Sequence, residues 1–92
     1  MKINNEWLTI GTTVLLNAGN QPLTIIGRYQ MSKDKVTYDY TGILNPQGYQ
    51  DSKSLYLFNQ NDIAEVLFEA PTTEYEHRYL KELSDFIDQE IE

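Results

Sequence analysis

Apolar and polar residues alternate at every second position in several short stretches of the chain, a pattern typical of β-strands with two unlike faces. The clearest is residues 36–48, VTYDYTGILNPQG, in which Val36, Tyr38 and Tyr40 share one face. Gly42 stands where a side chain would crowd a bend or a neighbouring backbone. The Asn-Pro-Gln-Gly run ends the strand, because proline has no N–H for the ladder and glycine accepts positive φ. We therefore expect a central strand here.

Two more strands are expected before that stretch. Residues 12–18 and 21–29 flank an Ala-Gly-Asn connection, and Gly and Asn tolerate the positive φ of tight hairpin turns. Pro22 must then lie at the first position of its strand or on a free edge. The charged turn 32–35 leads into the strand already described, which predicts a three-stranded antiparallel meander.

Two further strands are expected at residues 55–58 and 63–69. The first, LYLF, is wholly apolar, which predicts a strand covered on both sides. Between them, Asn59 and Asp62 have the spacing of a capped helical turn, in which Asp62 returns a hydrogen bond to the N–H of Asn59. A calcium loop is the alternative for this run, but the alternating acids, the glycine and the twelfth-position glutamate are missing.

The strands carry two apolar sets on opposite faces. The first set is Val14, Leu16, Leu23, Ile25, Val36, Tyr38, Tyr40, Val66 and Phe68. The second set is Leu15, Ile26, Ile43 and Leu67. A sheet with one solvated face would not need the second set, so either the sheet curls into a small barrel around the first set or another element covers the second face. The two arrangements are compatible.

An amphipathic helix is expected at the C-terminal end. Pro71 ends the last strand, Thr73 and Glu76 have the spacing of a capping box, and apolar residues follow three and four apart. These are Tyr75, Tyr79, Leu80, Leu83, Phe86, Ile87 and Ile91. The helix is the obvious cover for the second apolar set. We expect one α+β domain, mainly β, over residues 1–92: a five-stranded antiparallel curled sheet or SH3-like barrel at 11–69, and the helix at 73–91.

Charge and composition narrow the classes of function. The net charge is −7, and residues 74–92 alone hold seven acidic and two basic side chains. An acidic chain repels phosphate groups, so we expect no binding to nucleic acid or to anionic membranes. The absence of cysteine excludes disulfides, a thiolate nucleophile and cysteine zinc sites. No apolar run has the length of a signal peptide core or a membrane span, so we expect a soluble, cytoplasmic protein.

No motif in the sequence indicates catalysis or a bound metal. The single histidine, His77, lies between Glu74 and Lys81 on the predicted helix, which is typical of a solvated face, and nothing supplies further zinc ligands. Glu74 and Glu76 are two positions apart and face different ways, so they do not form an acid/base pair. The glycines form no phosphate-binding cluster. We expect no enzyme activity and no cofactor.

Aromatic residues are the remaining candidates for function, with seven Tyr, three Phe and one Trp. Tyr29, Tyr49 and Tyr56, at strand ends and in a loop, could line a groove for an extended peptide or lie at the rim of a small core. Trp7 is either a binding hot spot or a lid over the core edge. The candidate protein-binding residues are Trp7, Tyr29, Tyr49, Tyr56, Tyr75, Tyr79 and Phe86.

Four segments carry a resemblance to a known family: GTTVLL, PLTIIGRYQ, YDYTGILNPQGY and LFNQNDIAEVLF. The more specific parts are Tyr38-Asp39-Tyr40, Gly42, Pro46-Gln47-Gly48, and Phe58-Asn59 through Asp62-Ile63. Over residues 8–70 the chain resembles the domain of unknown function 4176 family. Its members are short proteins of Gram-positive bacteria, often encoded beside LXG-type toxins of the type VII secretion system. The shared residues belong to turns and core rather than to a catalytic signature.

The resemblance implies an accessory role, as a non-enzymatic adaptor or targeting chaperone that binds a toxin or its helical targeting partners. Type VII substrates and their partners typically carry a WxG turn or a Tyr-x-x-x-Asp/Glu signal. Here Leu-Thr follows Trp7, and no tyrosine has an acid four residues later, which indicates a helper that stays in the cytoplasm. An immunity protein that neutralises the toxin domain is the alternative. A homodimer through helix 74–91 is expected only if that helix is detached from its own sheet.

Overall fold

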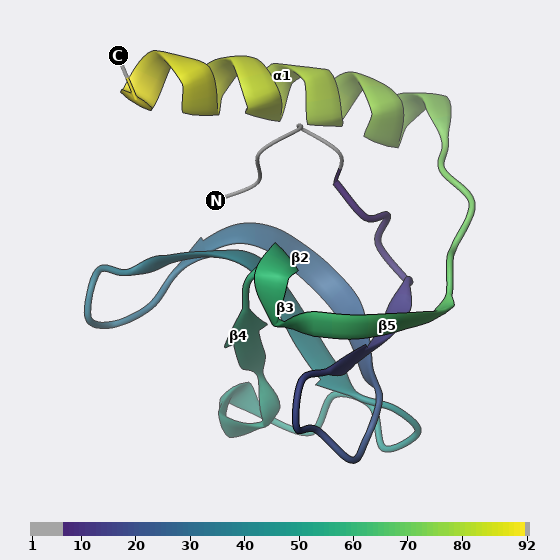
Figure 1. The fold of residues 1–92 in the computed structure, drawn as a ribbon. Coiled ribbons are helices and arrows are strands. Elements are labelled where there is room, and N and C mark those ends of the chain that lie inside the picture. Colours follow the sequence, from purple (N-terminus) through teal and green to yellow (C-terminus); the bar gives the residue numbers. More distant parts are fainter. Residues whose placement is uncertain (1–6, 92) are drawn as a thin grey trace.

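The computed structural model describes residues 7–91 as a five-stranded antiparallel sheet and one C-terminal helix (Figure 1). The strands and helix are β1 (Thr13–Leu16), β2 (Leu23–Met31), β3 (Thr37–Leu44), β4 (Tyr56–Phe58), β5 (Ile63–Phe68) and α1 (Glu74–Ile91), with 3₁₀ turns at Ser52–Ser54 and Gln60–Asp62. The strand order is β4-β3-β2-β1-β5. The sheet is curled and open, with β4 and β5 at its edges. The expected α+β, mainly β fold is confirmed.

The predicted hairpin and meander are both present. β1 pairs antiparallel with β2, with Val14 opposite Leu23, and β2 pairs with β3 along its whole length, from Leu23 opposite Leu44 to Met31 opposite Thr37. β3 also pairs with β4 on its other side, so β2 is the middle strand of the five. Within the described residues, no helix is long and apolar enough to span a membrane.

A bulge in β2 decides which of its side chains face the core. Ile25 pairs with Gly42 and Gly27 pairs with Thr41, so Ile26 is an extra residue on its strand. Directly paired residues share a face of an antiparallel sheet. Arg28 is paired with Tyr40, and so it faces the same side as Ile25. The bulge thus brings a cation onto the apolar face.

The hydrophobic core lies between this face of the sheet and α1. Its buried apolar members are Trp7, Val14, Leu23, Ile25, Tyr40, Phe58, Leu83 and Ile87. The described part of the N-terminal segment, residues 7–12, passes between the helix and the sheet (Figure 1). There the ring of Trp7 meets that of Tyr40 edge-on, with centroids 5.7 Å apart. Helix, segment and sheet therefore form one packed unit.

One expectation about packing is wrong. α1 covers the face of the first apolar set, and Ile26 and Leu67 of the second set remain exposed. The helix takes that face because Leu83 and Ile87 complete the core there. Since α1 packs on its own sheet, the condition stated for a dimer through a detached helix is not met.

Edge positions also differ from the expected burial. Three residues that were expected inside the sheet are exposed: Val36, Val66 and Phe68. Tyr56 is also exposed, although its strand β4 was expected to be covered on both sides. Val36 precedes β3 in a turn, whereas the other three belong to β4 and β5, the edge strands. An edge strand has a neighbour on one side only, so half of its surroundings is solvent.

Candidate protein-binding surface

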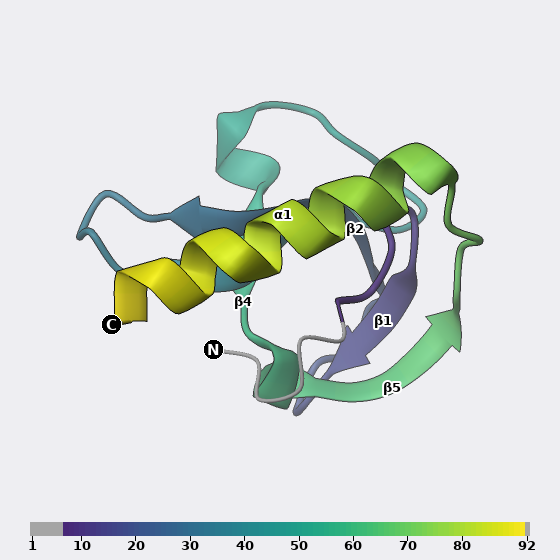
Figure 2. The same ribbon diagram turned by 90° about the horizontal axis from the view of Figure 1, so that it is seen from above.

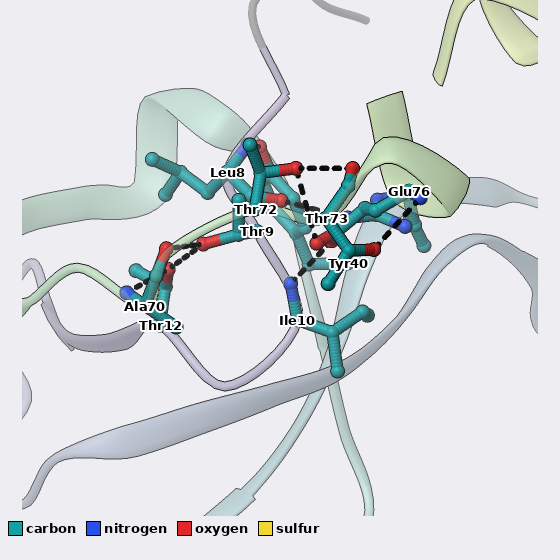
Figure 3. A network of polar contacts seen from close by, with 10 residues as sticks. Leu8, Thr9, Ile10, Thr12, Tyr40, Ala70, Thr72, Thr73 and Glu76 are labelled. Atoms are coloured by element: carbon teal, nitrogen blue, oxygen red, sulfur yellow. Dashed lines mark hydrogen bonds and ion pairs between the residues drawn. The ribbon is translucent and has the colours of Figure 1, made fainter. Parts of the chain in front are cut away.

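The first turn of α1 is joined to the sheet by the side chain of Glu76. The hydroxyl of Thr73 accepts a hydrogen bond from the N–H of Glu76 (3.1 Å), which is one half of the predicted capping box. The Glu76 carboxylate is turned toward the sheet, where it accepts hydrogen bonds from the N–H of Ile10 (2.8 Å) and from the Arg28 guanidinium. Figure 3 shows this network around the helix start. Glu76 therefore links α1, the N-terminal segment and β2.

Arg28 is the buried partner in this link, with 7% of its surface exposed. Its guanidinium also donates to the carbonyl of Leu8 (3.2 Å) and lies 5.8 Å from the centroid of the Tyr79 ring, within reach of a cation–π contact. Burial acts to raise the pKa of Glu76, but the hydrogen bond from Ile10 and the contact with Arg28 outweigh it and hold that pKa below its ordinary value. The ion pair thus persists down to acidic pH.

Tyr29 joins the far end of α1 to the same strand. Its hydroxyl donates to the carboxylate of Glu90, and its ring meets that of Phe86 edge-on at 6.2 Å. The hydrogen bond to Glu90, with some burial and the negative charge, raises the pKa of Tyr29. Tyr29 has a left-handed backbone conformation, with φ of 54°. This breaks the strand alternation, and as a result the consecutive residues Arg28 and Tyr29 both reach the helix.

The Tyr-Asp-Tyr motif stabilises the turn between β4 and β5. The side-chain oxygen of Asn59 accepts from the N–H of Asp39 (2.9 Å), and the Asp39 carboxylate accepts from the N–H of Gln60 (2.8 Å). Asp62 accepts from the N–H of Asn59 (2.8 Å), as predicted for a capped turn. This run therefore serves as a turn. Among the described residues, no three potential metal ligands gather into one group.

Tyr40 connects that turn to the N-terminal segment. Its hydroxyl donates to the side chain of Gln60 and accepts from the N–H of Leu8, each at 2.9 Å. Tyr40 is fully buried, and burial raises its pKa to about 12. Its role in this structure is therefore internal, as a polar bridge within the core.

The exposed aromatic residues of α1 form one flank of the helix. Tyr75, Tyr79 and Phe86 are 81%, 48% and 50% exposed, respectively. Positions i, i+4 and i+11 lie on the same flank, which extends over about 16 Å at 1.5 Å per residue. Tyr29 from β2 contacts the last of them. We call these four residues the aromatic shoulder.

The remaining candidate residues lie elsewhere. Trp7 is buried in the core, as in the lid alternative, and is not available on the surface. Tyr49 is exposed in the loop after β3, and Tyr56 lines a shallow hollow with Leu16 and Leu23. Of the three tyrosines suggested for a peptide groove, Tyr29 contacts Phe86 and Glu90 of α1, whereas Tyr49 and Tyr56 lie in the loop after β3 and on β4.

Acidic side chains border the aromatic shoulder on the outer side of the helix. Glu74, Glu82, Asp85 and Asp88 are exposed, whereas Glu76 is directed inward to its ion pair. The two bases of α1 are Arg78, whose guanidinium lies 5.8 Å from the Tyr75 ring centroid, and Lys81. His77 is exposed, as expected for a solvated face. The surface is thus aromatic along one line and negative beside it.

Sequence reasoning missed Arg28, which positions the helix and thereby the aromatic shoulder. A signal was present, because Arg28 is the only charged residue between Pro22 and Met31, in a strand otherwise made of apolar and neutral side chains. A charge in such a strand needs a partner if it faces the core. Its partner is 48 positions away in the chain, and periodicity does not reveal such pairs.

Comparison with known protein families shows the family of this chain. No curated protein and no solved structure is similar to the chain at a significant level. The family model described as domain of unknown function (DUF4176) matches residues 7–79, from the buried Trp7 to Tyr79 of the aromatic shoulder. That range contains the whole sheet and the start of α1 with its ion pair. The chain therefore belongs to the DUF4176 family.

Proposed function

We propose that this protein is a non-enzymatic accessory factor, an adaptor or targeting chaperone, that binds another protein during type VII secretion of a toxin. The aromatic shoulder carries the proposal. Tyr75 is 81% exposed, and Tyr79 and Phe86 are about half exposed, on a helix that packs into the core through Leu83 and Ile87. Aromatic side chains are enriched in protein interfaces, where they contribute large contact areas at low entropic cost.

The rigid attachment of α1 supports this use. Glu76 and Glu90 bond to the consecutive residues Arg28 and Tyr29, which hold the helix near both of its ends. A surface fixed in this way loses little conformational freedom when a partner binds. The neighbouring acids favour a partner helix with apolar residues bordered by Lys or Arg, since opposite potentials increase association rates and specificity.

Co-expression with the neighbouring toxin, divided into its N-terminal helical region and its C-terminal toxic domain, tests the role. Capture of the helical region supports the adaptor. Capture of the toxic domain alone refutes it and supports the alternative, an immunity protein, for which the acidic helix would suit a basic target.

Surface variants test the site. Replacing both Tyr79 and Phe86 by Ala should weaken capture by at least about tenfold, because aromatic anchors contribute most of the binding energy at such interfaces. The matched control is Tyr49→Ala, which removes an exposed tyrosine from a loop and should leave capture unchanged. If the control weakens capture and the double variant does not, the aromatic shoulder is not the interface.

A further inference from the structure

β5 is an edge strand whose outer side has no strand partner among the described residues. Within residues 7–91 it pairs with β1 only, and it forms the rim of the sheet away from β2 (Figure 2). Three consecutive residues on it, Val66, Leu67 and Phe68, are 43%, 46% and 59% exposed. Sheet edges in natural proteins are usually protected by charges, proline or a covering segment. This edge has bulges and two acids, yet three consecutive apolar side chains remain exposed on it.

The charges around that run all have one sign. Exposed Glu65 and Glu69 flank the three apolar residues directly. No lysine or arginine occurs between Lys53 and Arg78, so no base on β5 or its adjoining turns offsets these acids. The edge is therefore apolar in the middle and negative at both ends.

This charge pattern disfavours a second copy of the chain as the occupant. In the symmetrical antiparallel pairing that matches Val66, Leu67 and Phe68 with themselves, Glu65 of each copy lies opposite Glu69 of the other. Like charges directly opposite one another destabilise a strand pair. The net charge of −7 adds repulsion between whole molecules. A strand with the opposite charges at its ends has neither problem.

We propose that β5 is a strand-addition site for an extended segment of another protein, made of about three apolar residues with Lys or Arg at each end. Main-chain hydrogen bonds would supply affinity, and the two bases opposite Glu65 and Glu69 would set the register. The pairing is short, because the register of β5 against β1 shifts at Ala64 and Leu67, and such bulges twist an edge.

This site is separate from the aromatic shoulder. It lies on β5 rather than on α1, and it does not depend on the adaptor role. A chain with Tyr79 and Phe86 both replaced by Ala should therefore keep its full affinity for a strand-forming peptide. The two proposals can fail independently.

The test uses the full chain and a synthetic peptide, Ser-Gly-Lys-Val-Ile-Val-Lys-Gly-Ser, in an amide NMR titration. Saturable shifts should concentrate in β5 and β1. A peptide with Glu in place of both Lys should bind at least about tenfold more weakly, and added salt should reduce this difference. Shifts centred on α1, equal affinity for the two peptides, or no saturation at about 1 mM would overturn the proposal.

Edge variants provide the second readout. Leu67→Lys and Phe68→Lys place a base against the basic peptide and remove apolar contact, so each should weaken binding by about tenfold. The matched control is Ile26→Lys on the interior strand β2, where exposure is similar at 42% and binding should stay within about twofold. Thermal unfolding confirms that each variant is folded. Equal losses in all three, or self-association that Leu67→Lys abolishes, would refute this assignment.

Discussion

Replacing Glu76 by Gln should destabilise the protein by about 3 kcal/mol, because it leaves the buried guanidinium of Arg28 without its counter-charge. Loss of one partner from a buried ion pair costs about 3–5 kcal/mol. We expect the lower end, since Arg28 keeps the Leu8 carbonyl at 3.2 Å and the Tyr79 ring at 5.8 Å. The new amide oxygen can also still accept from the N–H of Ile10.

Such a loss is large against a typical total of about 5–15 kcal/mol, and it should lower the melting temperature by roughly 12–24 °C for a domain of this size. Urea unfolding followed by the fluorescence of Trp7, the single tryptophan, measures it directly. The control is Glu82→Gln on the exposed side of the same helix, which should change stability by less than about 0.5 kcal/mol. A Glu76→Gln variant as stable as this control would refute a stabilising ion pair between Glu76 and Arg28.

The same substitution has a predicted pH signature. The pKa of Glu76 is lowered in the folded protein from an ordinary value of 4.5. Its contribution is therefore fully present above pH 4.5 and is lost as the pH falls below that value toward the folded pKa. The wild-type protein should lose more stability than Glu76→Gln on acidification, so the two unfolding curves should converge. Curves that stay parallel at acidic pH would contradict the assigned pKa direction.

Two further substitutions test the core. Tyr40→Phe removes both hydrogen bonds of the buried hydroxyl and should cost about 1–3 kcal/mol in urea unfolding. Because the pKa of Tyr40 is raised from 10.0 to about 12, its stabilisation is complete below pH 10 and declines as the pH rises toward 12, so the variant should lose less stability over that interval. Gly42→Ala would place a methyl group 3.0 Å from the Phe58 ring and should cost about 1–3 kcal/mol, whereas Gly27→Ala, with no atom nearer than 3.6 Å, should be neutral. Equal thermal stability of the two alanine variants would refute the crowding argument.

The parts of this protein that the sequence predicts correctly depend on neighbours close in the chain. The first hairpin forms where it was predicted, although its positive φ is at Ala18 and not at Gly19 or Asn20. The Asn59 and Asp62 pair specifies a single turn, and Thr73 starts the helix. Each of these is decided by backbone preferences or by a hydrogen bond between residues three positions apart. For the aromatic shoulder, the helical spacing of Tyr75, Tyr79 and Phe86 was sufficient to place them on one flank.

Long-range packing determines the face of the sheet on which α1 lies and the aromatic side chains that remain exposed. The helix was expected on the second apolar set but covers the first, whereas alternation itself grouped Val14, Leu23, Ile25 and Tyr40 correctly on one face. A strict period of two does not predict the extra residue Ile26 or the left-handed Tyr29, which bring Arg28 and Tyr29 to the helix. Both irregularities depend on pairing with β3 and contact with the helix, and no local preference encodes them. The Arg28 and Glu76 ion pair likewise forms only when segments 48 positions apart are packed together. Local rules thus determine the elements, and long-range packing determines the surface that they present.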